Sequence, residues 1–187
     1  MSIQEKQSLS MERIVDAFRC RRLPWWREQG LAQEREAEER PKPWPARPPG
    51  WRWSGQGSPR RVVQDREGLW GRCDWIVQGA RGHHLVLLGE LTPTLRLRLR
   101  LLGALWDRAH GERPGLWFQS SGTLEAGWEG TWPDTCRARV EPLTAAELAV
   151  IADQVRTTLD SPWPPEGTAP QGRCWDCPGF CFCGDRG

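Results

Sequence analysis

The chain has 187 residues, of which 38% are hydrophobic and 27% are charged, and its formal net charge is +2. This length allows one domain with a hydrophobic core, or one domain with a small appendage. No apolar run approaches the ~20 residues of a membrane span, which excludes a helical membrane protein, and so small a charge does not by itself indicate nucleic-acid binding. The N-terminal stretch MSIQEKQSLSMERI lacks the apolar segment of a secretory signal, so we expect a cytoplasmic protein.

The first sixty residues predict helices followed by an irregular segment. Residues 9–20 have apolar side chains at helical spacing with Ser10 as N-cap, and Pro24 is expected to end this helix. Residues 27–40 are charged and rich in helix formers, which predicts a solvated helix. Residues 41–59 contain too much Pro and Gly for regular structure. Residues 27–60 are therefore interpreted as a loop or helical insertion.

The middle of the chain predicts strands and one longer helix. GLWGRCDWIV and HLVLLGELT, joined by QGARGHH, predict a β-hairpin. Residues 95–101 alternate Leu and Arg, which taken alone favours a strand. However, Thr92 and Pro93 are a good N-cap and first helical residue, so we predict a helix from about residue 93 to 109, with Gly111 just past its end.

The last third predicts two strands, a helix and a tail. GLWFQSSG and CRARVEP are expected to be strands, and Thr144 and Glu147 form a capping box before a helix that reaches residue 159. Residues 161–187 form a Pro-rich loop and a cysteine-rich tail. The order of these elements predicts a mixed α/β fold in one domain over residues 1–187.

The tail RCWDCPGFCFCGDRG places four cysteines within ten residues. Reducing compartments disfavour structural disulfides and seven cysteines cannot pair completely, so metal ligation is expected. A Cys-x2-Cys pair lets two thiolates converge on one metal, and a tetrahedral site needs four ligands. Either the tail supplies all four as a zinc knuckle, or it supplies three and Cys20 the fourth. Cys73 and Cys136 are interpreted as small buried apolar residues.

These cysteines resemble those of the iron–sulfur RecB-type PD-(D/E)xK nucleases, which include the CRISPR-associated exonucleases and the AddB nuclease domain. In that family one cysteine follows an N-terminal helix, and three more, as Cys-x2-Cys-Pro-x4-Cys, close the domain around a [4Fe–4S] cluster. AFRCRR and CWDCPGFCFC match both parts. The resemblance implies a restriction-endonuclease-like core, in which helices flank a mixed β-sheet and the cluster ties the C-terminal tail to the first helix. It implies that the cluster ligands are Cys20, Cys174, Cys177 and Cys183, with Cys181 as a spare.

The same resemblance implies an active site on the hairpin. The family has an Asp on one strand and D/E-x-K on the next, and the two carboxylates bind Mg²⁺ or Mn²⁺. Asp74 matches the first carboxylate and Glu90 the second, but Thr92 stands where the family has lysine. Because loss of this lysine is expected to cost orders of magnitude in rate, we expect a degenerate nuclease centre. Alternatively, Asp74 accepts hydrogen bonds from backbone or arginine groups, and Glu90 pairs with an arginine of the following helix.

Arginines cluster in CRRLPWWR, SPRR and LRLRLRL, and the first cluster is interleaved with Trp25 and Trp26. Arginine beside aromatic rings suits a nucleic-acid strand, although a solvated face with packed Trp gives the same pattern. The acidic run EREAEER would instead contact a protein. The candidate DNA-binding residues are Arg21, Arg22, Arg96, Arg98 and Arg100.

Three functions follow from these observations. The first is a DNA-processing protein that binds single strands or ends as a subunit of a helicase or CRISPR-type complex, with a degenerate nuclease centre. The second is an active Mg²⁺- or Mn²⁺-dependent DNA exonuclease. The third is a protein-interaction module of unrelated fold with a zinc-binding tail.

Overall fold

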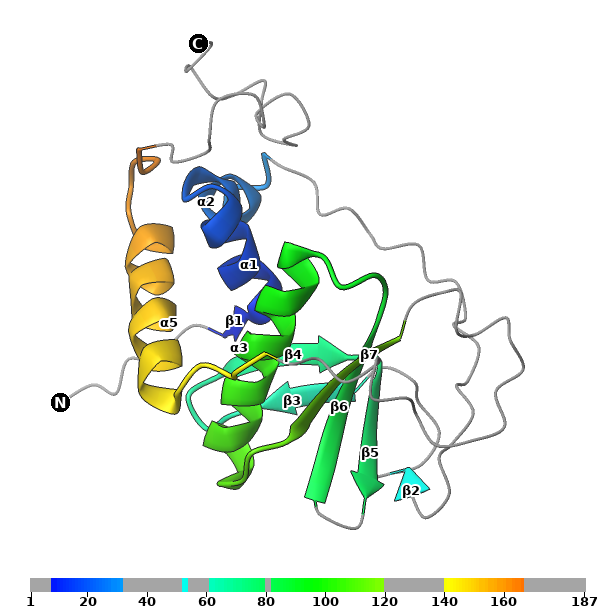
Figure 1. Ribbon diagram of the computed structural model, residues 1–187. Helices are drawn as coiled ribbons and strands as arrows, with labels where there is room; N and C mark the ends of the chain where they lie inside the picture. The colour runs from blue at the N-terminus through cyan, green and yellow to red at the C-terminus, as the bar shows by residue number, and fades with distance from the viewer. Residues whose placement is uncertain (1–7, 32–51, 54–60, 80–81, 120–139, 167–187) are drawn as a thin grey trace, which may run out of the picture. The chain divides into compact units, whose positions relative to one another are not determined.

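The computed structural model describes residues 8–31, 52–53, 61–79, 82–119 and 140–166 (Figure 1). These ranges form a mixed α/β fold with two small sheets and four helices. The chain divides into two compact units: Met1–Met11 with Pro41–Leu148, and Glu12–Arg40 with Ala149–Gly187. The single domain expected over residues 1–187 stays a prediction. No helix within the described ranges has the length and apolar character needed to cross a membrane.

The first unit contains both sheets. The smaller sheet has the strand order β1-β4-β3, with β1 parallel and β3 antiparallel to β4. Its strands are β1 (Leu9–Ser10), β3 (Arg61–Gln64) and β4 (Leu69–Cys73). The helix expected over residues 9–20 therefore begins two residues late, because Leu9 and Ser10 pair with Leu69 and Trp70 of β4.

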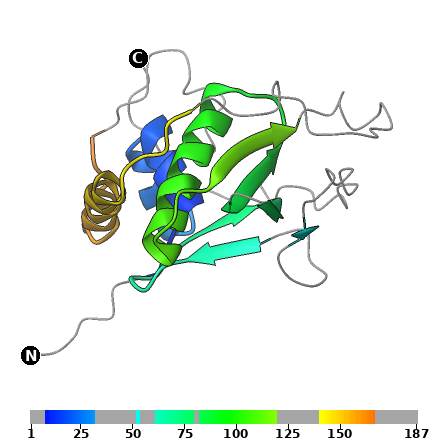
Figure 2. The same cartoon turned by 60° about the horizontal axis from the view of Figure 1, so that its bottom comes forward.

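The larger sheet has the strand order β2-β5-β6-β7. Its strands are β2 (Arg52–Trp53), β5 (Trp75–Gly79), β6 (Gly82–Leu88) and β7 (Gly115–Gln119). The antiparallel pair β5–β6 is the predicted hairpin, with Trp75 opposite Val86 and Gly79 opposite Gly82. The pair β6–β7 is parallel and is connected through helix α3 (Pro93–His110), which lies along the sheet (Figures 1 and 2).

Helix α3 confirms the prediction made from Thr92 and Pro93. The Thr92 Oγ1 atom accepts a hydrogen bond from the Leu95 N–H at 3.2 Å, and Gly111 closes the helix in the left-handed conformation with φ of 69°. The segment that alternates Leu and Arg is helical, because leucines at helical spacing within it and just after it are buried against the sheets. These leucines are Leu95, Leu99 and Leu102.

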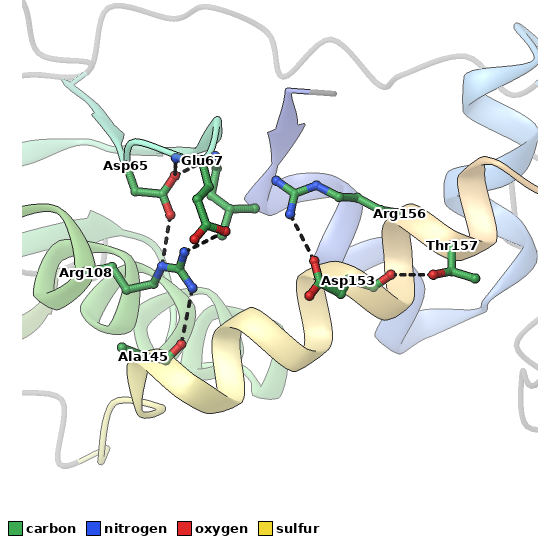
Figure 3. Close-up of polar contacts among 8 residues, drawn as sticks. Asp65, Glu67, Arg108, Ala145, Asp153, Arg156 and Thr157 are labelled. Atoms are coloured by element: carbon green, nitrogen blue, oxygen red, sulfur yellow. Dashed lines mark hydrogen bonds and ion pairs between the residues drawn. The ribbon is translucent and has the colours of Figure 1, made fainter. Parts of the chain in front are cut away.

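Three elements of the first unit meet at Arg108, near the end of α3 (Figure 3). Its Nε–H donates to Asp65 Oδ2 at 3.0 Å, an Nη2–H pairs with Glu67 Oε2 at 3.1 Å, and an Nη1–H donates to the Ala145 carbonyl at 3.4 Å. Asp65 is buried, and its Oδ1 accepts the N–H groups of Glu67 and Leu69, both at 2.9 Å. The turn between β3 and β4 is thereby joined to α3 and to the first residue of helix α5 (Ala145–Leu159).

Helix α5 also confirms its predicted start. The Glu147 N–H donates to Thr144 Oγ1 at 3.1 Å, and Glu147 Oε2 accepts from the Thr144 N–H at 2.7 Å. These reciprocal bonds are the capping box expected from the sequence. Its hydrogen bonds lower the pKa of the Glu147 carboxyl below its ordinary value, because they favour the charged form.

The second unit contains α1 (Met11–Arg19), α2 (Arg22–Glu28) and most of α5. The prediction that Pro24 ends the first helix is wrong, because α1 ends at Arg19 and Pro24 lies in the first turn of α2. A proline is tolerated there because the first helical N–H groups have no partner within the helix. A salt bridge at 2.5 Å between Arg27 and the buried Asp16 joins α1 to α2.

Three other sequence predictions are changed or lie in part outside the described residues. The solvated helix predicted over 27–40 does not continue α2, which ends at Glu28 and is followed by Gly30 with φ of 69°; residues 32–40 are not described. Within 41–59, Arg52 and Trp53 form β2, and the others are not described. Of CRARVEP, residues 140–142 form no strand and residues 136–139 are not described.

Candidate functional site

Asp74 lies at one end of the β5–β6 pair. It precedes β5 directly, and its own N–H donates to the Val86 carbonyl at 3.0 Å. Its side chain is half-buried, and Oδ2 accepts the Leu88 N–H at 2.7 Å. A backbone N–H at the end of β6 therefore holds this carboxylate. This agrees with the alternative prediction that Asp74 accepts hydrogen bonds from backbone groups.

Glu90 lies beyond the same end of the pair. Strand β6 ends at Leu88, and Gly89 has a φ of 131°, a conformation that favours glycine. Glu90 is exposed and its carbonyl accepts the Thr92 N–H at 2.7 Å. Because β5 and β6 are antiparallel, the residue before β5 and the residues after β6 lie at the same end. The structure thus brings the Asp74 and Glu90 segments to one edge of the sheet.

Thr92, which stands where the resemblance predicts a lysine, lies in the connection between β6 and α3. Its hydroxyl caps the helix, and this role accounts for a threonine at this position. A lysine ammonium has donors only and cannot accept the Leu95 N–H. The structure therefore gives Thr92 a role in helix formation.

The arginines of α3 do not form one row. Arg96 and Arg100 are exposed and four residues apart, so they share a face of the helix, whereas Arg98 is half-buried and lies on another side. The Nε–H of Arg100 donates to the Glu141 carbonyl at 3.1 Å. Arg96 and Arg100 are thus the pair that a polyanion would reach from solvent.

Cys20 lies at the junction of α1 and α2. Cys20 is buried and packs with Leu23 and Trp26. Its backbone carbonyl accepts the Leu23 N–H at 3.0 Å. The second buried cysteine that the structure describes, Cys73 in β4, is 1% exposed, as expected for a small apolar residue. The other cysteines of the chain lie outside the described residues: Cys136, Cys174, Cys177, Cys181 and Cys183.

The segment that leads into the tail is hydrogen-bonded to α2. The Trp25 Nε1–H donates to the Ser161 carbonyl at 2.8 Å, and the Arg22 Nε–H donates to the Pro165 carbonyl at 2.7 Å. Arg22, a candidate DNA-binding residue, therefore holds the protein's own main chain, while Arg21 is exposed. The described part of this segment ends at Glu166, one residue after the Pro165 that Arg22 binds.

A further polar cluster, which the sequence analysis did not predict, joins the start of β6 to the loop after α3. Glu112 Oε1 accepts a hydrogen bond from His83 Nδ1 at 2.5 Å and one from the Trp106 Nε1–H at 3.1 Å, and the His110 ring lies 4.0 Å from the Trp106 ring. These bonds lower the pKa of the Glu112 carboxyl, with the His83 bond contributing most. The sequence carries no local signal for this cluster, because His83 and Glu112 are 29 residues apart.

No group of three or more His, Cys, Asp or Glu side chains that could hold a metal ion occurs among the described residues. Of the metal ligands predicted from the sequence, the structure describes three: Asp74 and Glu90 at one end of the β5–β6 pair, and Cys20 at the junction of α1 and α2. Comparison of the chain with protein-family models, with curated proteins and with solved structures gives no match.

Proposed function

We propose that this protein is a DNA-processing subunit with an iron–sulfur RecB-type nuclease fold and a degenerate nuclease centre. It would bind DNA, as single strands or ends, within a larger complex of the helicase or CRISPR type. The observation that carries the proposal is the arrangement of the β5–β6 hairpin, α3 and the parallel strand β7, with Asp74 and Glu90 at one end of the hairpin. A PD-(D/E)xK core would have its two carboxylates on adjacent strands; here Asp74 directly precedes β5 and Glu90 lies two residues after β6.

The carboxylates fit a divalent cation in their number and chemistry. Mg²⁺ and Mn²⁺ prefer oxygen ligands and are commonly held by one or two carboxylates together with water and phosphate. Asp74 and Glu90 would hold the ion, which when bound would activate water and stabilise charge on a phosphate. Thr92 offers no positive charge beside them, and this difference supports a degenerate centre.

The surroundings of Cys20 fit one end of a cluster site. Cys20 is buried beside apolar side chains, and α2 binds the segment that ends at Glu166. Eight residues separate Glu166 from Cys174 and span at most about 28 Å. Cys174 must therefore lie within this distance of Glu166, at the end of the segment that α2 binds. Cys20, Cys174, Cys177 and Cys183 would hold the cluster, and its first role would be to link the tail to α1.

Metal and sulfide analysis tests the cluster. Protein purified without oxygen is expected to contain iron and sulfide, with a broad absorbance shoulder near ~400 nm. Cys20→Ser should lose the iron, whereas Cys181→Ser, the matched control, should keep it. A colourless wild-type protein with one equivalent of zinc that Cys20→Ser retains would instead establish the zinc-tailed interaction module.

Nuclease and binding assays test the rest of the proposal. With Mn²⁺ and labelled single-stranded DNA, the wild type is expected to bind the strand but not to cleave it at a rate typical of nucleases. If the wild type digests the strand and Glu90→Ala abolishes cleavage, the centre is active and the exonuclease alternative is correct.

A further inference from the structure

The second unit carries the large apolar side chains that are exposed among the described residues. There are four of them, and each belongs to Glu12–Arg40 or to Ala149–Gly187, whereas the described part of the first unit exposes none. They are Phe18, Leu31, Val150 and Trp163. Exposed apolar side chains gathered in one small unit are typical of a surface that contacts another protein.

Trp163 is the most exposed of the four, at 76%, and lies in residues 161–166, which we call the strap. Side chains of α2 hold the strap, because Trp25 and Arg22 donate hydrogen bonds to the carbonyls of its first and fifth residues. The Ser161 hydroxyl donates to the Trp163 carbonyl at 2.8 Å and accepts the Trp163 N–H at 3.3 Å. The three prolines of the strap restrict the backbone on both sides of the ring. The backbone that carries Trp163 is thus restrained before any partner binds, which lowers the entropy cost of binding.

Carboxylates lie on both sides of this ring in the sequence. Asp160, directly before the strap, and Glu166, at its end, are exposed, and each is three residues from Trp163. Residues 157–166 contain no lysine or arginine. Trp163 is therefore an aromatic anchor with negative charges around it.

Phe18, at the end of α1, has the opposite charge beside it. It is 55% exposed, whereas Ile14, one helical turn earlier, is fully buried. Arg19 follows Phe18 directly and is exposed. Arg22, four residues after Phe18, binds the strap, so both rings lie around the start of α2. The second unit thus presents one ring beside carboxylates and one ring beside a cation.

We infer that the second unit forms a homodimer in which Trp163 of each copy packs against Phe18 of the other. A two-fold axis makes this contact occur twice, and it brings Asp160 and Glu166 of one copy beside Arg19 of the other. The charges favour a second copy as the occupant, because both halves of the complementary contact belong to the same unit. Carboxylates beside Trp163 would repel a nucleic acid or an anionic lipid surface from this ring.

The size of the contact predicts a weak dimer. One aromatic side chain buries about 150–250 Å², and each dimer would contain four such rings. Interfaces that bury less than about 1,200 Å² are typical of weak or transient association. We therefore expect a monomer–dimer equilibrium with a micromolar dissociation constant. The inference does not depend on the proposed DNA binding or on the proposed cluster.

Sedimentation equilibrium of the full chain, with a thiol reductant and at up to about 100 μM protein, tests the inference. The wild type is expected to dimerise reversibly. Trp163→Ser should weaken the dimer by at least about 30-fold, because an aromatic anchor of this kind is a typical hot spot and each dimer contains it twice. Val150→Ser removes an exposed apolar side chain from α5 in the same unit; it is the matched control and should dimerise like the wild type.

A charge exchange between copies gives a result that misfolding cannot produce. Arg19→Glu, and the double variant with Asp160→Arg and Glu166→Arg, should each be monomeric, because like charges then face one another at both contacts. An equimolar mixture of the two variants should dimerise, because each contact of the mixed pair again joins opposite charges. Thermal unfolding checks that each variant alone is folded.

The inference is overturned if the wild type is monomeric at about 100 μM, or if Trp163→Ser dimerises as the wild type does. A monomeric wild type whose thermal midpoint falls in Trp163→Ser would show that another part of the same chain covers the ring. A wild type that dimerises while the mixed charge variants do not would also overturn the arrangement. None of these results affects the iron and sulfide analysis or the DNA assays, so a failure here is distinguishable from a failure of the proposed function.

Discussion

The Thr92 side chain caps helix α3 just beyond the end of β6. The hydroxyl accepts the Leu95 N–H and so satisfies one of the first N–H groups of α3. Under the proposed function, this position would correspond to the lysine of the nuclease pattern. A threonine that caps α3 would then leave the proposed centre without that cation.

Thr92 substitutions should therefore affect stability before activity. Thr92→Ala is expected to lower the free energy of unfolding by about 1 kcal/mol through loss of the cap, whereas Thr92→Ser should stay close to the wild type. Urea unfolding measured by circular dichroism gives both values. Equal stability of the Ala and Ser variants would show that the hydroxyl does not cap α3.

Glu112 introduces a pH-dependent contact at the other end of α3. The pKa of its carboxyl lies below the ordinary value of 4.5 because His83, then Trp106, donate hydrogen bonds to the charged form. A lowered pKa contributes stability that is present above pH 4.5 and is lost as the pH falls through the folded-state value. The salt bridge is partly exposed, so its contribution is modest.

The pH dependence can be measured with Glu112→Gln. The thermal midpoint of this variant should lie below that of the wild type at pH 6, and the difference should shrink as the pH falls below 4.5. The Trp106 indole can keep its hydrogen bond in this variant, because the glutamine carbonyl still accepts the Nε1–H. A difference between the two proteins that is constant from pH 6 to pH 3 would contradict an ionised Glu112 in the folded state.

At the scale of elements, α3 organises the first unit. Its buried leucines cover the sheets, its start is fixed by Thr92, and near its end Arg108 binds the β3–β4 turn and the start of α5. Asp65 is the centre of this contact, since one of its oxygens holds the turn and the other holds Arg108. The network therefore couples the turn of one sheet to both neighbouring helices (Figure 3).

Loss of Arg108 should be costly because it leaves a buried carboxylate without its cation. The side chains of Arg108 and Asp65 are 13% and 3% exposed, and Arg108→Gln is expected to destabilise the protein by about 3 kcal/mol. Glu67→Gln is the matched control: its side chain is 46% exposed, so it should change the free energy of unfolding by less than about 1 kcal/mol. Denaturant unfolding of the three proteins makes the comparison, and similar losses for both variants would show that Asp65 is not stabilised by Arg108.

At the scale of the whole molecule, the proposed cluster would connect two distant parts of the sequence. Contacts of Trp25 and Arg22 already hold residues 161 and 165 to α2. A cluster between Cys20 and the tail would close a loop of about 150 residues and restrict the unfolded chain accordingly. Its effect should therefore appear in stability as well as in colour.

Thermal unfolding of the cysteine variants tests this structural role. Cys20→Ser should lower the thermal midpoint by on the order of 10 °C relative to the wild type under anaerobic conditions, whereas Cys181→Ser should not. Loss of iron from Cys20→Ser without a change in midpoint would show that the cluster binds at Cys20 but does not stabilise the fold.

The sequence by itself determined the local features of this protein. The caps at Thr92, Gly111 and Thr144, the span of α3 and the β5–β6 hairpin were all predicted, because each depends on side chains within a few residues of the backbone groups that they satisfy. The pairing of Asp74 with Glu90 came from the resemblance to the nuclease family, and the hairpin places the two residues at one end of the β5–β6 pair.

Only the tertiary structure decided which strands and surfaces these elements form. The pairing of β1 with β4 and of β2 with β5 and the Arg108 network depend on contacts between residues far apart in the chain. Local propensity carries no information about such contacts: Leu9 and Ser10 match a helix start as well as a strand until β4 offers them backbone partners. The same reason explains why Pro24 was misread, since the tertiary contacts of Leu23 and Trp25 favour a second helix around it.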